Sequence, residues 1–284
     1  MDPAREDRVH EVVTAEVISA FQRDGAVPLR GLFDAEDLDH LESGIAQNLA
    51  APGPRAKIAS DPDDPGQFFE DFCNWTRIAA YEAFIRRSPA AAAAGLLMGA
   101  DEVRFYHDHL LVKAAGTRQV TPWHQDQPFY NISGSQALSL WIPIDPVPRV
   151  STLEFVAGSH LGPWRMPRSF RDQQAKWFPP GALAEMPDIA ADPETYPVLG
   201  WSLRPGDAVA FHNLTLHAAA GVGPGRPRRV FSARFLGDDV THAPRPWATS
   251  PEFEGLKDEL PAGAPMHHPL FPVLWRKKVQ AGMT

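Results

Sequence analysis

The chain has a single cysteine, no long apolar run and no excess of basic residues. Cys73 cannot form a disulfide within the chain, and a zinc site built from several cysteine thiolates is excluded. No apolar run reaches the length of about 18 residues that a membrane helix needs, and residues 1–10 lack the pattern of a secretion signal. We therefore expect a cytoplasmic protein that does not associate with membranes.

The net charge excludes another class of partner. There are 35 acidic and 27 basic residues, so the formal net charge is −8. Proteins that bind nucleic acids carry basic stripes, and the one basic cluster here, at Arg226, Arg228 and Arg229, is short. We expect a small-molecule partner and no nucleic acid; the sequence carries no signal about the oligomeric state.

The composition is that of an ordinary globular protein, with 44% hydrophobic and 22% charged residues. A length of 284 residues is compatible with one large all-β domain. We predict a single domain over residues 1–284. Its parts are a mostly helical flank over 1–100, a β core over 101–240 with an insertion at 162–200, and a C-terminal tail over 241–284.

The first hundred residues predict three helices and one strand. In the first two helices, apolar residues recur every three or four positions, which is typical of one buried face. Asp34 and the pair Ser88-Pro89 are residues that start helices. The predicted elements are a helix over 10–21, a strand over 25–30, a helix after Asp34, a surface loop over 51–66 and a helix after Ser88-Pro89.

Beyond residue 100 the pattern changes to strands separated by turns. No alternation of strands and helices follows, so a doubly wound α/β sheet is disfavoured. A mainly β fold with flanking helices, in the form of a double-sheet antiparallel barrel, is favoured instead. The predicted strands are residues 103–113, 137–144, 153–156, 208–212 and 228–236.

His124 and Asp126 are candidate metal ligands, with His217 as a third. Residues two apart at the end of a strand project to the same side, while Gln125 points away. Two histidines and one carboxylate form the facial triad that binds Fe(II) and leaves coordination positions open. The same three residue types also suit zinc, so a zinc hydrolase is an alternative. A jelly-roll protein that binds a small molecule or metal without catalysis is another.

The residues around these ligands carry a family resemblance. Thr-Pro-Trp-His-Gln-Asp-Gln-Pro at 121–128, Ala-Gly-Ser-His at 157–160, and His217 followed by Arg228 resemble the phytanoyl-CoA dioxygenase family, as does the opening segment 21–33. The resemblance implies an Fe(II)- and 2-oxoglutarate-dependent oxygenase on a double-stranded β-helix (jelly-roll, cupin-like) core. By the same resemblance, His124, Asp126 and His217 bind the catalytic iron.

The resemblance also implies the reaction. O2 and 2-oxoglutarate are consumed, succinate and CO2 are released, and a C–H bond of a small organic molecule is hydroxylated or otherwise oxidised. Halogenases of this family lack the carboxylate ligand, so the presence of Asp126 favours hydroxylation.

Three further residues are candidates for binding the co-substrate. The family resemblance implies that Arg228 holds the distal carboxylate of 2-oxoglutarate, and side-chain chemistry supports this role, because a guanidinium pairs with a carboxylate in a bidentate manner. Strand alternation puts Arg228 and Arg229 on opposite faces, so neither can substitute for the other, and the spacing in the family selects Arg228. Trp141 follows His124 by 17 residues and lies near a family tryptophan beside the co-substrate, although a tryptophan in a strand is also compatible with plain core packing.

His109 shares a strand face with His107, Leu111 and Lys113. If that face lines the barrel, His109 can donate a hydrogen bond to 2-oxoglutarate or to substrate; the alternative is a polar face toward solvent. Several family members carry serine or threonine two residues after the distal histidine to help the arginine, but this chain has Ala219 there.

The insertion suggests the nature of the substrate. It contains aromatic residues and arginines, which together suggest an apolar pocket and an anionic substrate group. Gln127 and Asn131 are candidates for orienting the metal ligands, and His160 and His212 are expected to be structural hydrogen-bonding residues. The residues of the insertion that motivate this hypothesis are Trp164, Arg165, Arg168, Phe170, Arg171 and Trp177.

Overall fold

The computed structural model describes residues 2–167 and 178–278. Within these residues the strands form sheets of eight, four and two strands, and all of the strand pairs are antiparallel. The larger sheet has the order β1-β10-β7-β12-β4-β3-β2, with β14 also paired to β4, and the four-stranded sheet has the order β5-β11-β8-β9. This arrangement confirms the mainly β prediction.

The larger sheet contains β1 (Ala26–Leu29), β2 (Lys57–Ile58), β3 (Phe68–Phe72), β4 (Glu102–Lys113), β7 (Ala137–Pro143), β10 (Ala208–His212), β12 (Arg228–Leu236) and β14 (Val273–Arg276). The smaller sheets contain β5 (Thr121–His124), β8 (Leu153–Val156), β9 (Val198–Leu199) and β11 (His217–Ala219), and β6 (Ile132–Ser133) with β13 (Thr241–His242). The helices are α1 (Pro3–Val12), α2 (Ala15–Asp24), α3 (Ala35–Ala50), α4 (Ala79–Arg87), α5 (Ala90–Met98) and α6 (Leu256–Glu259). Three short 3-10 turns are η1 (Gln127–Phe129), η2 (Arg149–Ser151) and η3 (Ser159–Leu161).

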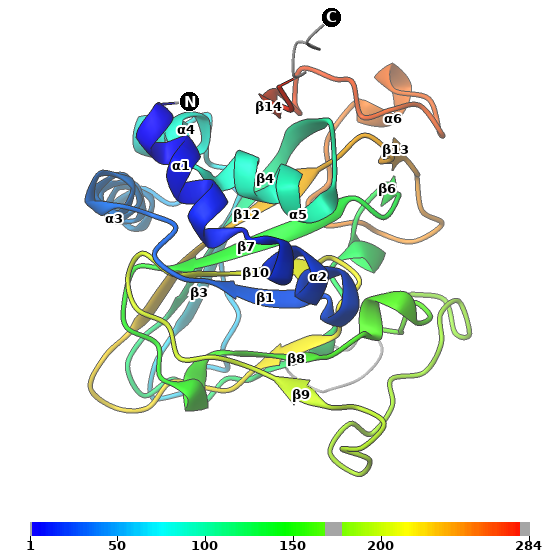
Figure 1. Ribbon diagram of the computed structural model, residues 1–284. Coiled ribbons are helices and arrows are strands. Elements are labelled where there is room, and N and C mark those ends of the chain that lie inside the picture. Colours follow the sequence, from blue (N-terminus) through cyan, green and yellow to red (C-terminus); the bar gives the residue numbers. More distant parts are fainter. Residues whose placement is uncertain (1, 168–177, 279–284) are drawn as a thin grey trace, which may run out of the picture.

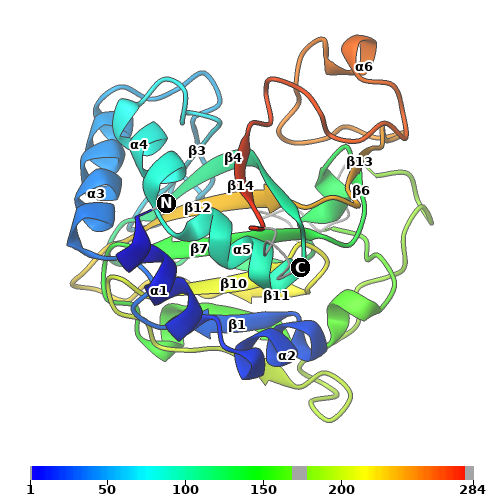
Figure 2. The same cartoon turned by 45° about the horizontal axis from the view of Figure 1, so that its top comes forward.

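The helices α1 to α5 gather on one side of the larger sheet, and β8 and β9 lie on the other side (Figures 1 and 2). The side chains of β12 alternate between two cores. Phe231, Ala233 and Phe235 join the core under the helices, whereas Val230 joins the core between the two sheets. The alternation predicted for this strand is therefore confirmed, and Arg228 lies on the inner side.

The prediction of one helix over 10–21 is wrong. The chain forms α1 and α2, and it changes direction at Val13 and Thr14 between them. The hydroxyl of Thr14 accepts a hydrogen bond from the Val17 amide at 3.4 Å, so it starts a new helix. Val9, Val13 and Phe21 are nevertheless all buried in the helix-side core, because both helices pack on the same sheet.

Two helix starts were predicted from capping residues. Asp34 caps α3 as expected, and it forms a reciprocal capping box with Asp37. The start after residue 88 differs by one position, because Pro89 is the N-cap of α5 while Ser88 ends α4. Helix α4 itself was not predicted.

The strands predicted beyond residue 100 are all present. Three of them, Leu153–Val156, Ala208–His212 and Arg228–Leu236, have the predicted bounds. Strands β2 and β3 were not predicted, and β2 lies within the segment 51–66 that was expected to be a loop. Two of the five residues of β3 are acidic, and their burial depends on partners far away in sequence.

The tail after residue 241 packs on the body. Strand β13 pairs with β6, and β14 pairs with β4. Among the described residues, no helix combines the length and the apolar character required to cross a lipid bilayer.

Candidate metal centre and adjoining cavity

Two histidines face each other across neighbouring strands. His124 ends β5 and His217 begins β11, and the two residues are directly opposite in the antiparallel ladder. Their ring centroids are 4.1 Å apart. This register explains how a histidine 93 positions further along the chain joins the His-x-Asp pair.

The backbone orients both rings in the same way. Nδ1 of His124 lies 2.8 Å from the carbonyl oxygen of Pro122, and Nδ1 of His217 lies 2.9 Å from that of Thr215. A carbonyl only accepts, so each Nδ1 carries a proton, and in the neutral ring the lone pair is then on Nε2. This is the tautomer that binds a metal through Nε2.

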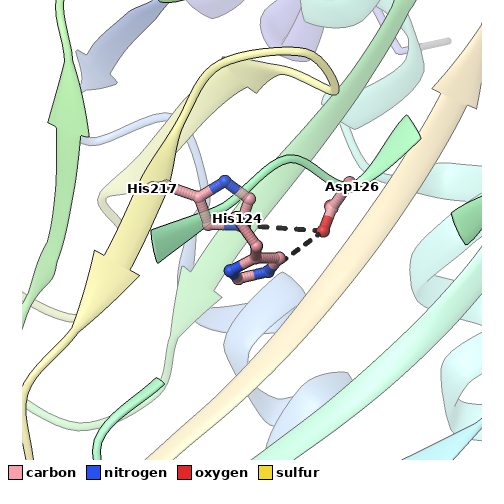
Figure 3. Close-up of side chains that lie close together, drawn as sticks. All are labelled: His124, Asp126 and His217. Atoms are coloured by element: carbon pink, nitrogen blue, oxygen red, sulfur yellow. Dashed lines mark ion pairs between the residues drawn. The ribbon is translucent and has the colours of Figure 1, made fainter. Parts of the chain in front are cut away.

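Asp126 completes the cluster from the N-cap position of η1. Its Oδ1 atom lies 3.6 Å from Nε2 of His124 and 3.6 Å from Nε2 of His217 (Figure 3). The three ligand atoms all lie within 4.8 Å of one another. One metal ion can therefore contact all three.

The charges of the cluster suit a divalent cation. Burial opposes ionisation of Asp126, but Arg234 and the two histidines outweigh it and hold the pKa of this carboxyl well below its usual value. Burial and the neighbouring His124 lower the pKa of His217 to about 3. At neutral pH the site therefore offers an ionised carboxylate and a neutral imidazole.

The second oxygen of Asp126 is held by the larger sheet. Oδ2 accepts a hydrogen bond from the Ser139 hydroxyl at 3.2 Å, and Nη2 of Arg234 lies 3.5 Å away. Gln127 and Asn131 were expected to orient the ligands, but their side-chain hydrogen bonds go to other groups. Gln127 donates to the carbonyl of Gly134, and Asn131 accepts from the Tyr106 hydroxyl.

Gln125 points away from the ligands, as alternation predicts, and it connects two loops. Its side-chain oxygen accepts from the Arg165 amide at 2.7 Å, and its amide donates to the carbonyl of Leu214 at 2.8 Å. It therefore ties the start of the predicted insertion to the loop that leads into His217.

A cavity opens beside the three ligands, between the two sheets. Arg228, Trp141 and His109, the three residues predicted to bind the co-substrate, all line it. The prediction missed several polar lining residues, chiefly Glu70, Thr121 and Ser232. Strand alternation places Ser232 on the same face as Arg228, whereas no signal in the sequence connected Glu70 to the site.

Arg228 is a buried cation at one end of this cavity. Nη1 donates to the carbonyl of Ser151, and the guanidinium lies over the ring of Trp141 at 5.5 Å. Among the described residues, no carboxylate lies within 4.0 Å of it, and burial lowers the pKa of Arg228 to about 10. Arg229, on the opposite face, pairs with Asp145 at 2.7 Å.

His109 is buried, so the alternative of a solvent-facing strand surface is wrong. Its Nε2 lies 3.3 Å from Oε1 of Glu70, and its Nδ1 lies 3.4 Å from Nη2 of Arg234. The ring also stacks on Phe72 at 3.8 Å. Both ring nitrogens therefore face protein groups.

His160 and His212 make structural hydrogen bonds, as predicted. Nε2 of His160 lies 3.2 Å from the carbonyl oxygen of Gln22. His212 donates from Nε2 to the carbonyl of Ser135 at 2.6 Å, and its Nδ1 accepts from the Leu214 amide.

The predicted insertion can be followed only in part. Arg168, Phe170, Arg171 and Trp177 lie outside the described residues. The guanidinium of Arg165 donates to the carbonyl of Glu185 at 2.7 Å. Trp164 lies under the guanidinium of Arg245, 4.7 Å from it.

Comparisons with known proteins agree with this geometry. The sequence model of the phytanoyl-CoA dioxygenase (PhyH) family matches residues 21–230. No curated protein matches the chain in sequence.

Solved structures share the fold over most of the chain. The non-heme alpha-ketoglutarate-dependent carbocyclase SnoK from nogalamycin biosynthesis has a TM-score of 0.72 at 21% identity, over 93% of this chain and 98% of that chain. The epimerase SnoN in complex with Fe3+, alpha-ketoglutarate and nogalamycin RO has a TM-score of 0.70 at 24% identity, over 96% of this chain and 100% of that chain. EctD from S. alaskensis with 2-oxoglutarate and 5-hydroxyectoine has a TM-score of 0.61 at 19% identity, over 79% of this chain and 76% of that chain. These likenesses confirm the double-stranded β-helix core.

Proposed function

The chain belongs to the phytanoyl-CoA dioxygenase family of Fe(II)- and 2-oxoglutarate-dependent oxygenases, and we propose how its residues serve that activity. His124, Asp126 and His217 are the iron ligands, and Arg228 holds the distal carboxylate of 2-oxoglutarate. When bound, iron and co-substrate supply the oxidation, in which O2 is consumed, 2-oxoglutarate becomes succinate and CO2, and a substrate C–H bond is oxidised.

The donor set supports iron. Two imidazole Nε2 atoms with free lone pairs and one ionised carboxylate oxygen converge within 4.8 Å. Nitrogen and oxygen donors of this kind suit Fe(II), and three protein ligands leave room for a chelating co-substrate.

The observation that carries the proposal is the buried charge of Arg228, for which the described residues supply no carboxylate within 4.0 Å. A buried guanidinium without a counter-ion is costly, and proteins pair such charges or bring them to a ligand. The cavity joins Arg228 to the three metal ligands, so a molecule with a carboxylate at one end and a chelating group at the other suits both ends. 2-Oxoglutarate has this form.

We assign two further cavity residues, Trp141 and Thr121, to the same co-substrate. Trp141 supports the guanidinium of Arg228 through the cation–π contact. Thr121 is the cross-strand partner of Ala219, and both line the cavity. The hydroxyl of Thr121 therefore takes the place of the serine or threonine hydroxyl that several family members carry at the position of Ala219. His109 can reach a ligand only if its ring gives up one of its present contacts.

The substrate is a small organic molecule, and we propose that it has an apolar face. The Phe129 ring lies 6.3 Å from that of His124, Phe178 lies 5.6 Å from Phe129, and Trp247 lies 5.0 Å from Phe178. These rings form an aromatic series that starts next to His124. An anionic substrate group would pair with Arg165, and Arg165→Ala would then raise the KM for the substrate.

Hydroxylation is the reaction that we propose for this C–H bond, since Asp126 is present. The solved structures of the same fold include a carbocyclase and an epimerase, so the outcome at the oxidised carbon depends on the substrate. We also propose one oxygenase domain over residues 1–284 and a cytoplasmic location, which the single cysteine supports.

The two alternatives, a zinc hydrolase and a non-catalytic binding protein, explain less. Neither requires a buried cation at the far end of the cavity from the metal ligands. Both predict that 2-oxoglutarate does not interact with bound iron.

The test is anaerobic reconstitution with Fe(II) and 2-oxoglutarate, followed through the visible metal-to-ligand charge-transfer band. We expect the band in the wild type. Arg228→Ala should weaken 2-oxoglutarate binding by about 100-fold, because truncating one partner of a buried charged pair costs about 2–5 kcal/mol. Arg229→Ala is the matched control and should bind like the wild type, since Arg229 pairs with Asp145 outside the cavity.

Iron content is measured separately in each protein. Wild-type protein that binds iron but gives no band with 2-oxoglutarate would contradict the proposed function. Equal 2-oxoglutarate affinity in wild type and Arg228→Ala would contradict the assignment of Arg228.

A further inference from the structure

A series of polar side chains crosses the wall of the cavity and ends on Asp126. Nζ of Lys57, on β2, lies 3.1 Å from Oε2 of Glu70, on β3. Oε1 of Glu70 lies 3.3 Å from Nε2 of His109, on β4, and Nδ1 of His109 lies 3.4 Å from Nη2 of Arg234, on β12. The same Nη2 atom lies 3.5 Å from Oδ2 of Asp126. The proposed iron and co-substrate contacts do not explain this series.

Glu70 is the most unusual member, because it is a carboxylate with 1% of its surface exposed. Burial opposes its ionisation, but His109 and Lys57 together lower the pKa of Glu70 to about 2. Glu70 is therefore ionised inside the barrel. A buried ionised group persists only with partners, and its buried partner is His109.

The contacts of His109 determine its tautomer. A guanidinium only donates, so Nδ1 of His109 accepts from Arg234. The ring proton is then on Nε2, which faces the carboxylate of Glu70. Burial lowers the pKa of His109 to about 4, so the ring is neutral at pH 7. In this tautomer the neutral imidazole directs its N–H toward Glu70, 3.3 Å away, and its lone pair toward Arg234, 3.4 Å away.

Arg234 links His109 to Asp126. Its Nε donates to the Tyr130 hydroxyl at 2.9 Å, and its Nη1 donates to the carbonyl of Ser232 at 3.1 Å. Nη2 is the atom shared between His109 and Asp126. The position of His109 therefore affects Nη2 of Arg234, the atom that contacts the carboxylate of Asp126.

We propose that Glu70 and His109 are positioning residues for Asp126, acting through Arg234, and that they raise the affinity of the site for its metal. With Oδ2 held by Arg234 and Ser139, the carboxylate presents Oδ1 alone to the two histidines. Outer groups that orient a ligand in this way commonly account for about 10- to 100-fold in metal affinity. The inference rests on the proposed role of Asp126 as an iron ligand.

The test titrates the metal-free protein with Co(II) alone and follows visible absorption, with no co-substrate present. We expect His109→Leu, which removes both nitrogens, to weaken Co(II) binding about 10-fold. His109→Gln keeps a donor and an acceptor and should restore binding to within about 3-fold of the wild type. Glu70→Gln should bind Co(II) with an affinity between those of the two His109 variants.

Glu102→Gln is the control for a lost carboxylate. Glu102 begins β4 and pairs with Arg104 and Arg276, and it does not line the cavity. This variant should bind Co(II) like the wild type. Nitrogen-15 NMR of the histidine rings in the metal-free wild type should show His109 with its proton on Nε2.

Three results would overturn the inference. One is unchanged Co(II) affinity in both His109→Leu and Glu70→Gln. Another is equal loss in His109→Leu and His109→Gln with a matching drop in Tm, which indicates a purely structural role. The third is an Nδ1–H tautomer of His109. Because the titration uses metal alone, a failure of 2-oxoglutarate binding does not affect it.

Discussion

Arg228 and Arg234 lie on the same face of β12, and 5% and 4% of their surfaces are exposed. Their surroundings differ. Arg234 contacts Asp126 and the Tyr130 hydroxyl, and these groups outweigh burial and raise the pKa of Arg234. Arg228 contacts a carbonyl and an indole, and burial lowers its pKa to about 10.

The comparison separates two kinds of buried charge in one cavity. The Arg234 end is neutralised by the chain itself and serves the metal ligand. The Arg228 end has no carboxylate among the described residues and is available to a ligand's carboxylate. A charge that is costly in the free protein becomes favourable when the ligand arrives, which gives selectivity for an anion.

The largest expected effect is a difference in stability between variants of the two arginines. Arg234→Met should lower the free energy of unfolding of the metal-free protein by about 3–5 kcal/mol, because it leaves Asp126 buried without its cation. Arg228→Met removes a buried charge that has no carboxylate partner among the described residues, and it should change the stability by less than about 1 kcal/mol. Urea denaturation of both variants measures the difference, and equal losses would show that Arg228 is also neutralised by the chain.

A smaller effect concerns the hydroxyl of Thr121 at the Arg228 end. Thr121→Val should weaken 2-oxoglutarate binding about 10-fold, since a hydrogen bond to a charged group contributes about 1.5–3 kcal/mol. Titration of the charge-transfer band measures it.

A double variant provides the control for Thr121. Ala219→Ser added to Thr121→Val puts a hydroxyl on the opposite residue of the ladder and should recover most of the affinity. Thr121→Val with wild-type affinity would mean that another group assists Arg228.

The smallest effect is on pH dependence. Lys113 is opposite Arg228 in the ladder, and burial and the charge of Arg228 lower the pKa of Lys113 to about 6, against the opposing influence of Glu70 and Asp64. A dicarboxylate bound at Arg228 raises that pKa, so binding takes up a proton. Affinity for 2-oxoglutarate should then fall about 3-fold between pH 6 and pH 8.

The variant Lys113→Met should make this pH profile flat. A fall of the same size in wild type and variant would assign the proton to another group.

The parts of the fold that alternate regularly were predictable. In β12, the alternation of side chains specifies the strand and the opposite directions of Arg228 and Arg229, with Phe231, Ala233 and Phe235 on the face of Arg229. The break between α1 and α2 was not predictable, because the apolar spacing continues through Thr14 and only the N-cap at this residue marks the start of a new helix. Strand β3 was missed because Glu70 and Asp71 meet their partners only in the folded chain, Glu70 with Lys57 and Asp71 with the Asn48 amide.

The metal ligands and the co-substrate arginine were predictable for a different reason. His124 and Asp126 are two residues apart, so local geometry suffices for them, while His217 and Arg228 belong to an ordered family pattern. Their environment was not predictable. The register that puts Thr121 opposite Ala219, and the contacts of Glu70 with His109, join segments that lie far apart in the sequence.

The sequence by itself determined the class of fold, the strand faces and the residue types able to bind iron and a carboxylate, because these depend on short-range spacing and on side-chain chemistry. Only the tertiary structure decided which buried charge has a partner and which does not. That outcome depends on the pairing of β12 with β4 and of β4 with β3, which brings Glu70, His109 and Arg234 into contact. Electrostatic pairing in a buried site is set by distances of a few ångströms between strands, and no local pattern encodes such distances.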